Sequence, residues 1–84
     1  MTEQFLDQLI EEFLKLKTKH AMKEFLGAIL TPGELEEIPK RLQIVKMLKK
    51  NIPQRDIAEK LGVGIATVTR GSRELQKGHF KNIT

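Results

Sequence analysis

The first thirty residues place large apolar side chains at helical spacing. Between residues 2 and 17 these side chains form two adjacent rows, Phe5, Leu9, Phe13 and Leu16 beside Leu6, Ile10 and Leu14. Acidic residues and a lysine fill the opposite face, as in an amphipathic helix, and the same period returns over residues 19–29. The combined apolar surface is larger than one 84-residue subunit is expected to cover, which predicts a dimer. A compact monomer whose later helices cover both rows is the alternative.

The residues TPGE mark the start of a third helix. Thr31 can accept a hydrogen bond from the Glu34 amide while the Glu34 carboxylate accepts one from the Thr31 amide, which is a capping box. Pro32 suits the first helical position because the N–H that it lacks has no partner there. The apolar period then runs to a stop signal at residues 51–53. Pro39 lies inside this period and is expected to kink the helix or split it in two, because proline removes a backbone hydrogen bond.

Two shorter helical patterns follow, over residues 54–61 and about 65–76, with a Gly-Val-Gly turn between them. This arrangement predicts a helix-turn-helix. Gly62 is expected to turn the chain in the left-handed conformation, and Val68 is expected to pack back on Ile57. The stretch Q-x-x-I-A-x-x-L-G-V-x-x-x-T-V-x-R fits the motif along its whole length. A plain helical hairpin in a bundle is the alternative.

The second of these two helices begins with small and hydroxyl-bearing side chains, where a core helix would have bulk and a solvated helix would have charge. In a helix-turn-helix, these N-terminal residues meet base edges in the major groove. Slim side chains allow close approach, threonine hydroxyls reach bases or phosphates, and apolar groups touch thymine methyls. The candidate DNA contacts are Gln54, Arg55, Gly64, Ile65, Ala66, Thr67 and Thr69. Ordinary helix surface is the alternative for the threonines.

One position departs from the general helix-turn-helix pattern. Such units usually carry a large apolar residue near position 71, and here that residue is glycine. Gly71 is therefore expected to leave a hole behind the second helix, and a hole flanked by Arg70 is a candidate ligand pocket.

Basic residues are concentrated in the second half of the chain. The net charge is +4, and residues 40–84 hold eleven Lys and Arg against three acidic residues. This asymmetry favours a polyanionic partner such as nucleic acid. The alternatives are a mildly basic domain without such a partner, or an interaction module whose basic half docks an acidic protein.

Composition and spacing argue against several other classes of protein. The chain has no cysteine, hence no disulfide or thiolate zinc site, and no apolar run of about 18 residues. The N-terminus lacks the features of a signal peptide, and we expect a cytoplasmic protein. His20 and His79 have no second ligand at metal-binding spacing, so no metal site is expected. With no nucleophile–base set and no P-loop, the sequence does not predict an enzyme.

Three segments together, L-T-P-x-E, R-L-x-I-V and Q-R-x-I-x-x-x-L-G-x-G-I-A-T-V-T-R-G-S, resemble the tryptophan repressor family. The match runs from about Ala28 to Leu75. It implies an intertwined all-helical homodimer that binds L-tryptophan as co-repressor and then a double-stranded DNA operator. The ligand would fix the angle and spacing of the two recognition helices, which must match half-sites roughly 34 Å apart.

The resemblance also implies the residues of the tryptophan site. Arg41 and Arg70 would flank the indole ring, and Arg70 would pair with the ligand carboxylate. Backbone carbonyls of a partner subunit would accept from the ammonium group. The implied set is Arg41, Arg70, Ile44, Thr67, Gly71 and Glu74, with Ala28, Leu30 and Thr31 contributed by the partner subunit.

The chain departs from the family pattern in several places. Glu74 stands where the family often has a small hydroxyl residue near the ligand amino group, which strengthens ammonium binding or indicates a different ligand. Ala58 replaces a common lysine, and Arg73 replaces a neutral polar residue and is a further candidate DNA contact. The family's final helix is missing or reduced to GHFKNIT. Related regulators lack a proven amino-acid ligand, so a DNA-binding regulator that needs no small molecule is the alternative function.

The sequence therefore predicts an all-α protein of five to six helices in one domain over residues 1–84. Residues 1–50 are expected to form a helical dimerisation core, 54–76 the DNA-reading unit and 77–84 a short tail. The expected function is that of a sequence-specific transcriptional repressor controlled by L-tryptophan.

Overall fold

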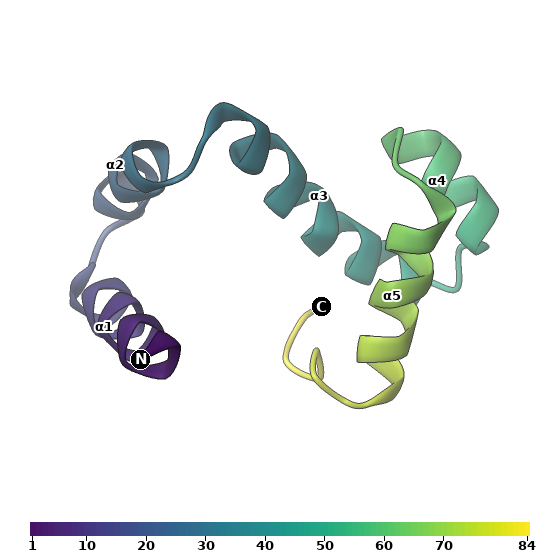
Figure 1. The fold of residues 1–84 in the computed structure, drawn as a ribbon. Helices are drawn as coiled ribbons and strands as arrows, with labels where there is room; N and C mark the ends of the chain where they lie inside the picture. Colours follow the sequence, from purple (N-terminus) through teal and green to yellow (C-terminus); the bar gives the residue numbers. More distant parts are fainter. The chain divides into compact units, whose positions relative to one another are not determined.

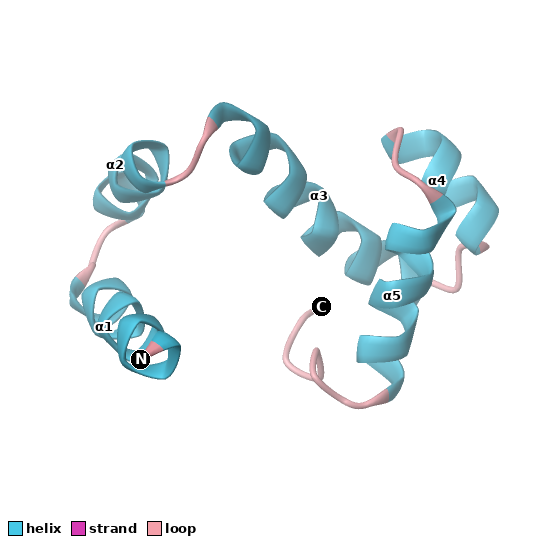
Figure 2. Cartoon of the chain, viewed as in Figure 1, coloured by secondary structure: helices cyan, strands magenta, loops and turns pink.

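The computed structural model describes all 84 residues and contains helices and turns but no strand. Five helices follow one another along the chain, α1 Thr2–Lys15, α2 Lys19–Ile29, α3 Pro32–Lys49, α4 Gln54–Leu61 and α5 Ile65–Gln76 (Figure 1). Short loops and turns join them (Figure 2). The predicted all-α class is confirmed. The chain divides into two compact units, residues 1–35 and residues 36–84, so that α3 begins in the first and ends in the second. None of the helices combines the length and the apolar character needed to span a membrane.

The first unit has a thin interior. Neither α1 nor α2 contains a buried residue. The two helices meet through Phe13 and Phe25, whose rings pack edge to face with centroids 5.4 Å apart. Leu9 is half-buried, as is Phe13, and the other apolar side chains of α1 are exposed, with Leu6 54% and Leu14 73% exposed. The first unit by itself therefore leaves most of the apolar rows of its N-terminal helix uncovered.

The capping box at the start of α3 forms as the sequence predicts. The Glu34 amide donates to Thr31 Oγ1 at 3.2 Å, and the Thr31 amide donates to Glu34 Oε1 at 2.8 Å. These hydrogen bonds lower the pKa of the Glu34 carboxyl because they stabilise its charged form. The helix therefore begins with its first amides satisfied and a negative charge at its positive end.

The expected split of α3 at Pro39 does not occur, because the helix continues through this residue to Lys49. Proline leaves the carbonyl of Leu35 without its usual helical partner. Both residues are exposed, so water can satisfy that carbonyl and the remaining backbone bonds hold the helix together.

The core of the second unit takes one fully buried side chain from each of three helices. Ile44 of α3, Ile57 of α4 and Val68 of α5 are at most 1% exposed and form one cluster. Burying an aliphatic side chain of this size stabilises the fold by about 1.5–3 kcal/mol. Partly buried neighbours surround the cluster, Met47, Leu48, Ile52, Ala58, Leu61 and Val63. The predicted packing of Val68 with Ile57 is confirmed, and the cluster fixes α5 to both preceding helices.

The turn between α4 and α5 has the predicted left-handed glycine. Gly62 closes α4 with φ 67° and ψ 37°. The Val63 amide then donates back to the Ala58 carbonyl at 3.0 Å, as in a glycine-terminated helix. Residues 62–64 thus separate two short helices that share one core, which is the helix-turn-helix arrangement.

Replacing Gly62 with alanine should lower the free energy of unfolding by about 1–2 kcal/mol, because an L side chain is strained in the left-handed region. No atom lies within 4 Å of a Cβ added there, so the effect is conformational. Gly64→Ala is the matched control, since Gly64 has equally open surroundings but φ −70°. Urea unfolding at one protein concentration measures both variants. Equal stabilities would contradict the left-handed turn.

Candidate functional site

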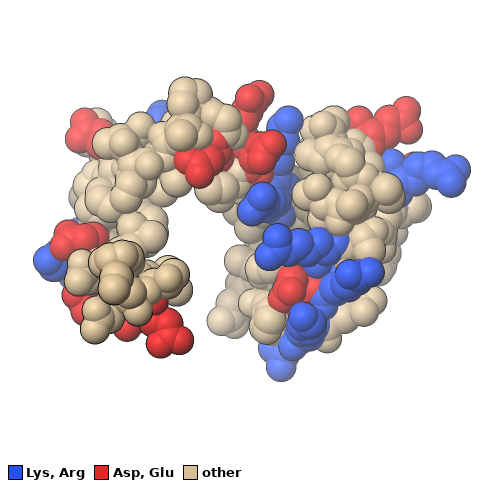
Figure 3. Space-filling model, viewed as in Figure 1, with Lys and Arg blue, Asp and Glu red and all other residues tan.

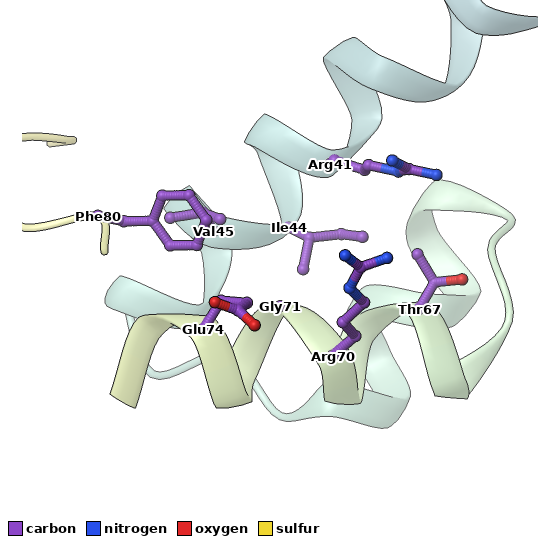
Figure 4. A pocket seen from close by; sticks show the side chains of 8 residues that line it. All are labelled: Arg41, Ile44, Val45, Thr67, Arg70, Gly71, Glu74 and Phe80. Carbon is purple, nitrogen blue, oxygen red and sulfur yellow. The ribbon is translucent and has the colours of Figure 1, made fainter. Parts of the chain in front are cut away.

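A pocket of about 220 Å³ lies between α3, α5 and the C-terminal segment of the second unit. The residues that line it are Arg41, Ile44, Val45, Thr67, Arg70, Gly71, Glu74 and Phe80 (Figure 4). An apolar cavity of about 150 Å³ is enough to hold benzene. The pocket therefore has the size for one small aromatic molecule, and its lining offers apolar surface together with charges of both signs.

Gly71 brings α5 close to α3 at one wall of the pocket. A Cβ at this position would lie 3.0 Å from Ile44 Cγ2 and 3.7 Å from Leu48 Cδ1. Ile44 occupies the space immediately at Gly71, while the expected hole flanked by Arg70 is present beside it, because Gly71 and Arg70 both line the pocket. The pocket opens beside this contact.

Two guanidinium groups lie at one end of the pocket. Figure 4 shows Arg41 of α3 and Arg70 of α5 extending to this end together with Thr67. Neither arginine has a carboxylate within the 4.0 Å of a salt bridge, since the four salt bridges of the chain involve lysine and histidine. Guanidinium groups pair with carboxylates in a fork geometry and stack on aromatic faces. Both groups are therefore available to a flat, anionic ligand.

Glu74 provides the negative charge in the pocket lining. Its side chain is 29% exposed, with Oε2 2.5 Å from His79 Nδ1 and Oε1 3.4 Å from Lys77 Nζ. The hydrogen bond with His79, followed by that with Lys77, lowers the pKa of the Glu74 carboxyl. The group is consequently ionised at neutral pH, and it joins α5 to the residues that follow this helix.

The C-terminal residues, expected to be only a short tail, form part of the pocket wall. The chain turns at Gly78 with φ 88°, and the His79 amide donates to the Glu74 carbonyl at 3.3 Å. The Lys49 ammonium of α3 donates to the carbonyls of Lys81 and Ile83. Phe80 is thereby placed in the lining, which the sequence did not predict. The glycine at position 78 indicated the end of α5 but not the direction in which the chain continues.

The structure brings together six of the nine residues predicted to bind the ligand, namely Arg41, Ile44, Thr67, Arg70, Gly71 and Glu74. Val45 and Phe80 complete the lining and were missed. Ala28, Leu30 and Thr31 lie in the first unit and were expected to act from a partner subunit, so their role stays a prediction.

The N-terminal part of α5 presents the surface of small side chains that is predicted to approach DNA. Gly64, Ala66 and Thr67 are exposed, and Ile65 is 54% exposed. The predicted phosphate contacts Arg55 and Arg73 are also exposed. Residues 36–84 hold eleven basic against five acidic residues, and Figure 3 shows Lys and Arg gathered over this unit. A helix face with small exposed side chains and nearby positive charges is suited to binding nucleic acid.

Two of the candidate DNA residues contact each other. The Thr69 hydroxyl lies 2.9 Å from Gln54 Oε1 and 3.0 Å from the Ile65 carbonyl. Both side chains are half-buried. They therefore link the start of α4 to α5, and part of their hydrogen-bonding capacity is used within the protein.

Histidine and carboxylate side chains pair locally rather than in larger groups. His20 lies 3.0 Å from Glu24, and His79 pairs with Glu74. The structure contains no group of three or more His, Cys, Asp or Glu side chains placed to hold a metal ion.

The chain is similar to known proteins along nearly its whole length. A family model described as Trp repressor protein matches residues 4–82. The Trp operon repressor homolog of Xylella fastidiosa (strain 9a5c) is 38% identical over 81 residues, covering 95% of this chain and 88% of that protein. Those of Chlamydia caviae and Actinobacillus succinogenes are 44% identical over 63 residues and 49% identical over 55 residues. These two alignments cover 74% and 64% of this chain, and 62% and 54% of the respective relatives. The family match includes the pocket, the helix-turn-helix and residues 4–35 of the first unit.

The contact of Glu74 with His79 can be tested by titration. His79→Ala should raise the pKa of the Glu74 carboxyl toward the ordinary value of 4.5, and Lys77→Ala should raise it less, because the histidine is the larger cause. Since the folded-state pKa is depressed, the contact stabilises the folded C-terminal segment at neutral pH and is lost as the pH falls through the lowered value. Carboxyl-carbon NMR measures the titration. The pKa of Glu34, set by Thr31, should not move in either variant, and an unchanged Glu74 in His79→Ala would contradict the contact.

Proposed function

Because the chain belongs to the Trp repressor protein family and is a transcriptional regulator, we propose that it represses transcription by binding operator DNA with L-tryptophan as co-repressor. The observation that carries this proposal is the pocket directly behind α5, where two unpaired guanidinium groups adjoin apolar side chains. The face of the same helix that carries small side chains is exposed to solvent. We take the site of action to be the cytoplasm, where such a regulator meets its DNA.

In this proposal, α5 enters the major groove as the recognition helix. The exposed Ile65 and Ala66 provide apolar contact for thymine methyls, and the exposed Thr67, which also lines the pocket, offers a hydroxyl for a polar contact. Arg55 and Arg73 neutralise phosphates on either side of the helix. The Gln54–Thr69 link keeps α4 and α5 in a constant relative position, so that base and phosphate contacts form together.

L-tryptophan would occupy the pocket between α3 and α5. Its indole ring stacks with the guanidinium groups of Arg41 and Arg70, above the apolar side chain of Ile44. Its carboxylate pairs with Arg70, which has no other carboxylate partner. A ligand that contacts both helices favours the arrangement of α5 in which it binds best, and so shifts the population toward the DNA-binding state.

A homodimer is also part of the proposal. The open apolar rows of α1 are of the kind that marks a protein–protein interface. A dimer would present two recognition helices to two half-sites one helical turn apart. In such a dimer, Ala28, Leu30 and Thr31 of each subunit would supply backbone carbonyls to the other subunit's ligand.

The co-repressor is tested by measuring operator affinity with and without L-tryptophan, on DNA selected from a random pool. The chain has no Trp or Tyr, so indole fluorescence reports the ligand alone. Arg70→Ala should weaken tryptophan binding about tenfold or more, the effect of losing a charge-assisted hydrogen bond. It should also remove the ligand-dependent gain in operator affinity.

Lys23→Ala, which removes a charge of the same sign from the first unit, is the matched control and should leave both measurements unchanged. Operator binding that is equally tight in tryptophan-free buffer would overturn the co-repressor. That result would establish instead a DNA-binding regulator that needs no small molecule.

The dimer is tested with Leu6→Lys, which places a charge in the middle of the apolar rows. Sedimentation velocity should show the dimer dissociation constant rising at least about tenfold, because a lysine ammonium resists burial in an apolar interface. Gln8→Lys adds the same charge on the opposite face of α1 and should leave the dimer intact. A monomeric parent chain, or a dimer insensitive to Leu6→Lys, would contradict this interface.

A further inference from the structure

Residues 77–84, which we call the C-terminal clip, are bonded to two different helices. On the α5 side, His79 Nδ1 lies 2.5 Å from Glu74 Oε2, and the His79 amide donates to the Glu74 carbonyl. On the α3 side, the ammonium of Lys49, the last residue of that helix, donates to two backbone carbonyls of the clip, those of Lys81 and Ile83. The clip therefore ties the C-terminal ends of α3 and α5 together.

The clip is the second attachment of α5 to α3. The first is the core contact, where Ile44 lies against the backbone at Gly71. Lys49 lies about 7.5 Å further along α3 than Ile44, at 1.5 Å per residue, and Glu74 lies about one turn beyond Gly71 on α5. A single contact acts as a pivot about which a helix can still turn, whereas a second attachment away from the pivot restricts that rotation. The clip is therefore placed to limit changes in the angle of α5 relative to α3.

Few interactions hold the clip itself in place. Only Gly78, Phe80 and Ile83 of the clip are half-buried, and its other residues are exposed. Phe80 lies in the lining of the pocket between α3 and α5, so the clip borders open space rather than a packed core. A segment held by a few hydrogen bonds and two apolar side chains can open locally without unfolding the rest of the unit. The clip is therefore a weak tie, comparable in strength with the contacts of one small ligand.

We propose that the C-terminal clip holds α5 in the DNA-binding arrangement for part of the time in the ligand-free chain, so that the clip and the ligand act on the same equilibrium. This inference rests on the proposed function, because it concerns the helix position that the ligand is proposed to set. A ligand can shift only those molecules that are not already in the binding arrangement. The clip therefore sets the operator affinity without ligand and limits the gain that the ligand adds. Lys49 and His79 are positioning residues, since neither lines the pocket.

The test releases the clip from each helix in turn. Lys49→Met removes the anchor on α3, and His79→Ala removes the side-chain anchor on α5. Operator affinity is measured with and without saturating L-tryptophan, on DNA selected with the parent chain. Without ligand, each variant should bind DNA about three- to tenfold more weakly, the change in an equilibrium that follows from losing a hydrogen bond. With saturating ligand the affinity should change little, so the gain produced by L-tryptophan should grow by the same factor.

Lys46→Met is the matched control. It removes the same charge from α3 one turn before Lys49, at a residue that has no bond to the clip. The loss of a positive charge weakens DNA binding through counterion release whether or not a ligand is present. The gain produced by L-tryptophan should therefore stay unchanged in this variant. Far-ultraviolet circular dichroism verifies that all three variants keep the helix content of the parent chain.

The outcomes separate this inference from the proposed function. Equal weakening with and without L-tryptophan in Lys49→Met and His79→Ala would overturn the inference, because the segment would then only support the fold or supply charge. Unchanged or tighter ligand-free binding would overturn it as well, and in both cases the co-repressor itself stands. If L-tryptophan has no effect on the parent chain, the co-repressor fails, and the ligand-free affinities of the two variants relative to Lys46→Met still decide the role of the clip. A parent chain that binds no operator would overturn both.

Discussion

The packing of α5 against α3 at Ile44 is the contact on which the rest of the second unit depends. Ile44 is buried in the core with Ile57 and Val68, touches the backbone at Gly71, and lines the pocket. A Cβ at position 71 would lie 3.0 Å from Ile44 Cγ2, so the Ile44 side chain would have to shift by a few tenths of an ångström to admit one. Ile44 therefore contributes both to the pocket lining and to the packing of the helix proposed to read DNA.

Because α5 packs against α3, the two faces of α5 carry different kinds of side chain. The outward face carries small residues and the exposed Ile65, while the face toward α3 carries Val68 in the core and Gly71 and Glu74 in the pocket. A molecule in the pocket acts on the helix from behind, through a core of only a few side chains. Because so few buried contacts define the position of α5, the added contacts of a single small ligand are comparable with those that already hold the helix. Ligand control of DNA binding is physically reasonable in a domain of this size for that reason.

The first unit has the opposite character, since its helices meet through one aromatic pair and bury no residue fully. A chain of 84 residues covers only part of its apolar surface by folding alone. A second copy in the proposed dimer would cover the rows of α1 that the first unit leaves exposed. In the proposed dimer, the stability of each subunit would depend on protein concentration.

The sequence by itself determined the features that depend on neighbours within a few residues. The bounds of α2, α4 and α5, the Thr31–Glu34 capping box and the left-handed Gly62 follow from local hydrogen bonds and backbone sterics, and the structure has them all. Arg41, Ile44 and Arg70 could be assigned to one site only through the resemblance to the tryptophan repressor family, not through their spacing. Only the tertiary structure decided that Ile44 fills the space at Gly71, that Thr69 bonds to Gln54, and that the C-terminal segment returns to place Phe80 in the pocket. The hydrogen bonds among these contacts join residues 15 to 34 positions apart along the chain. They follow from how the side chains fill space once the helices have packed, and no local period or turn signal carries that information.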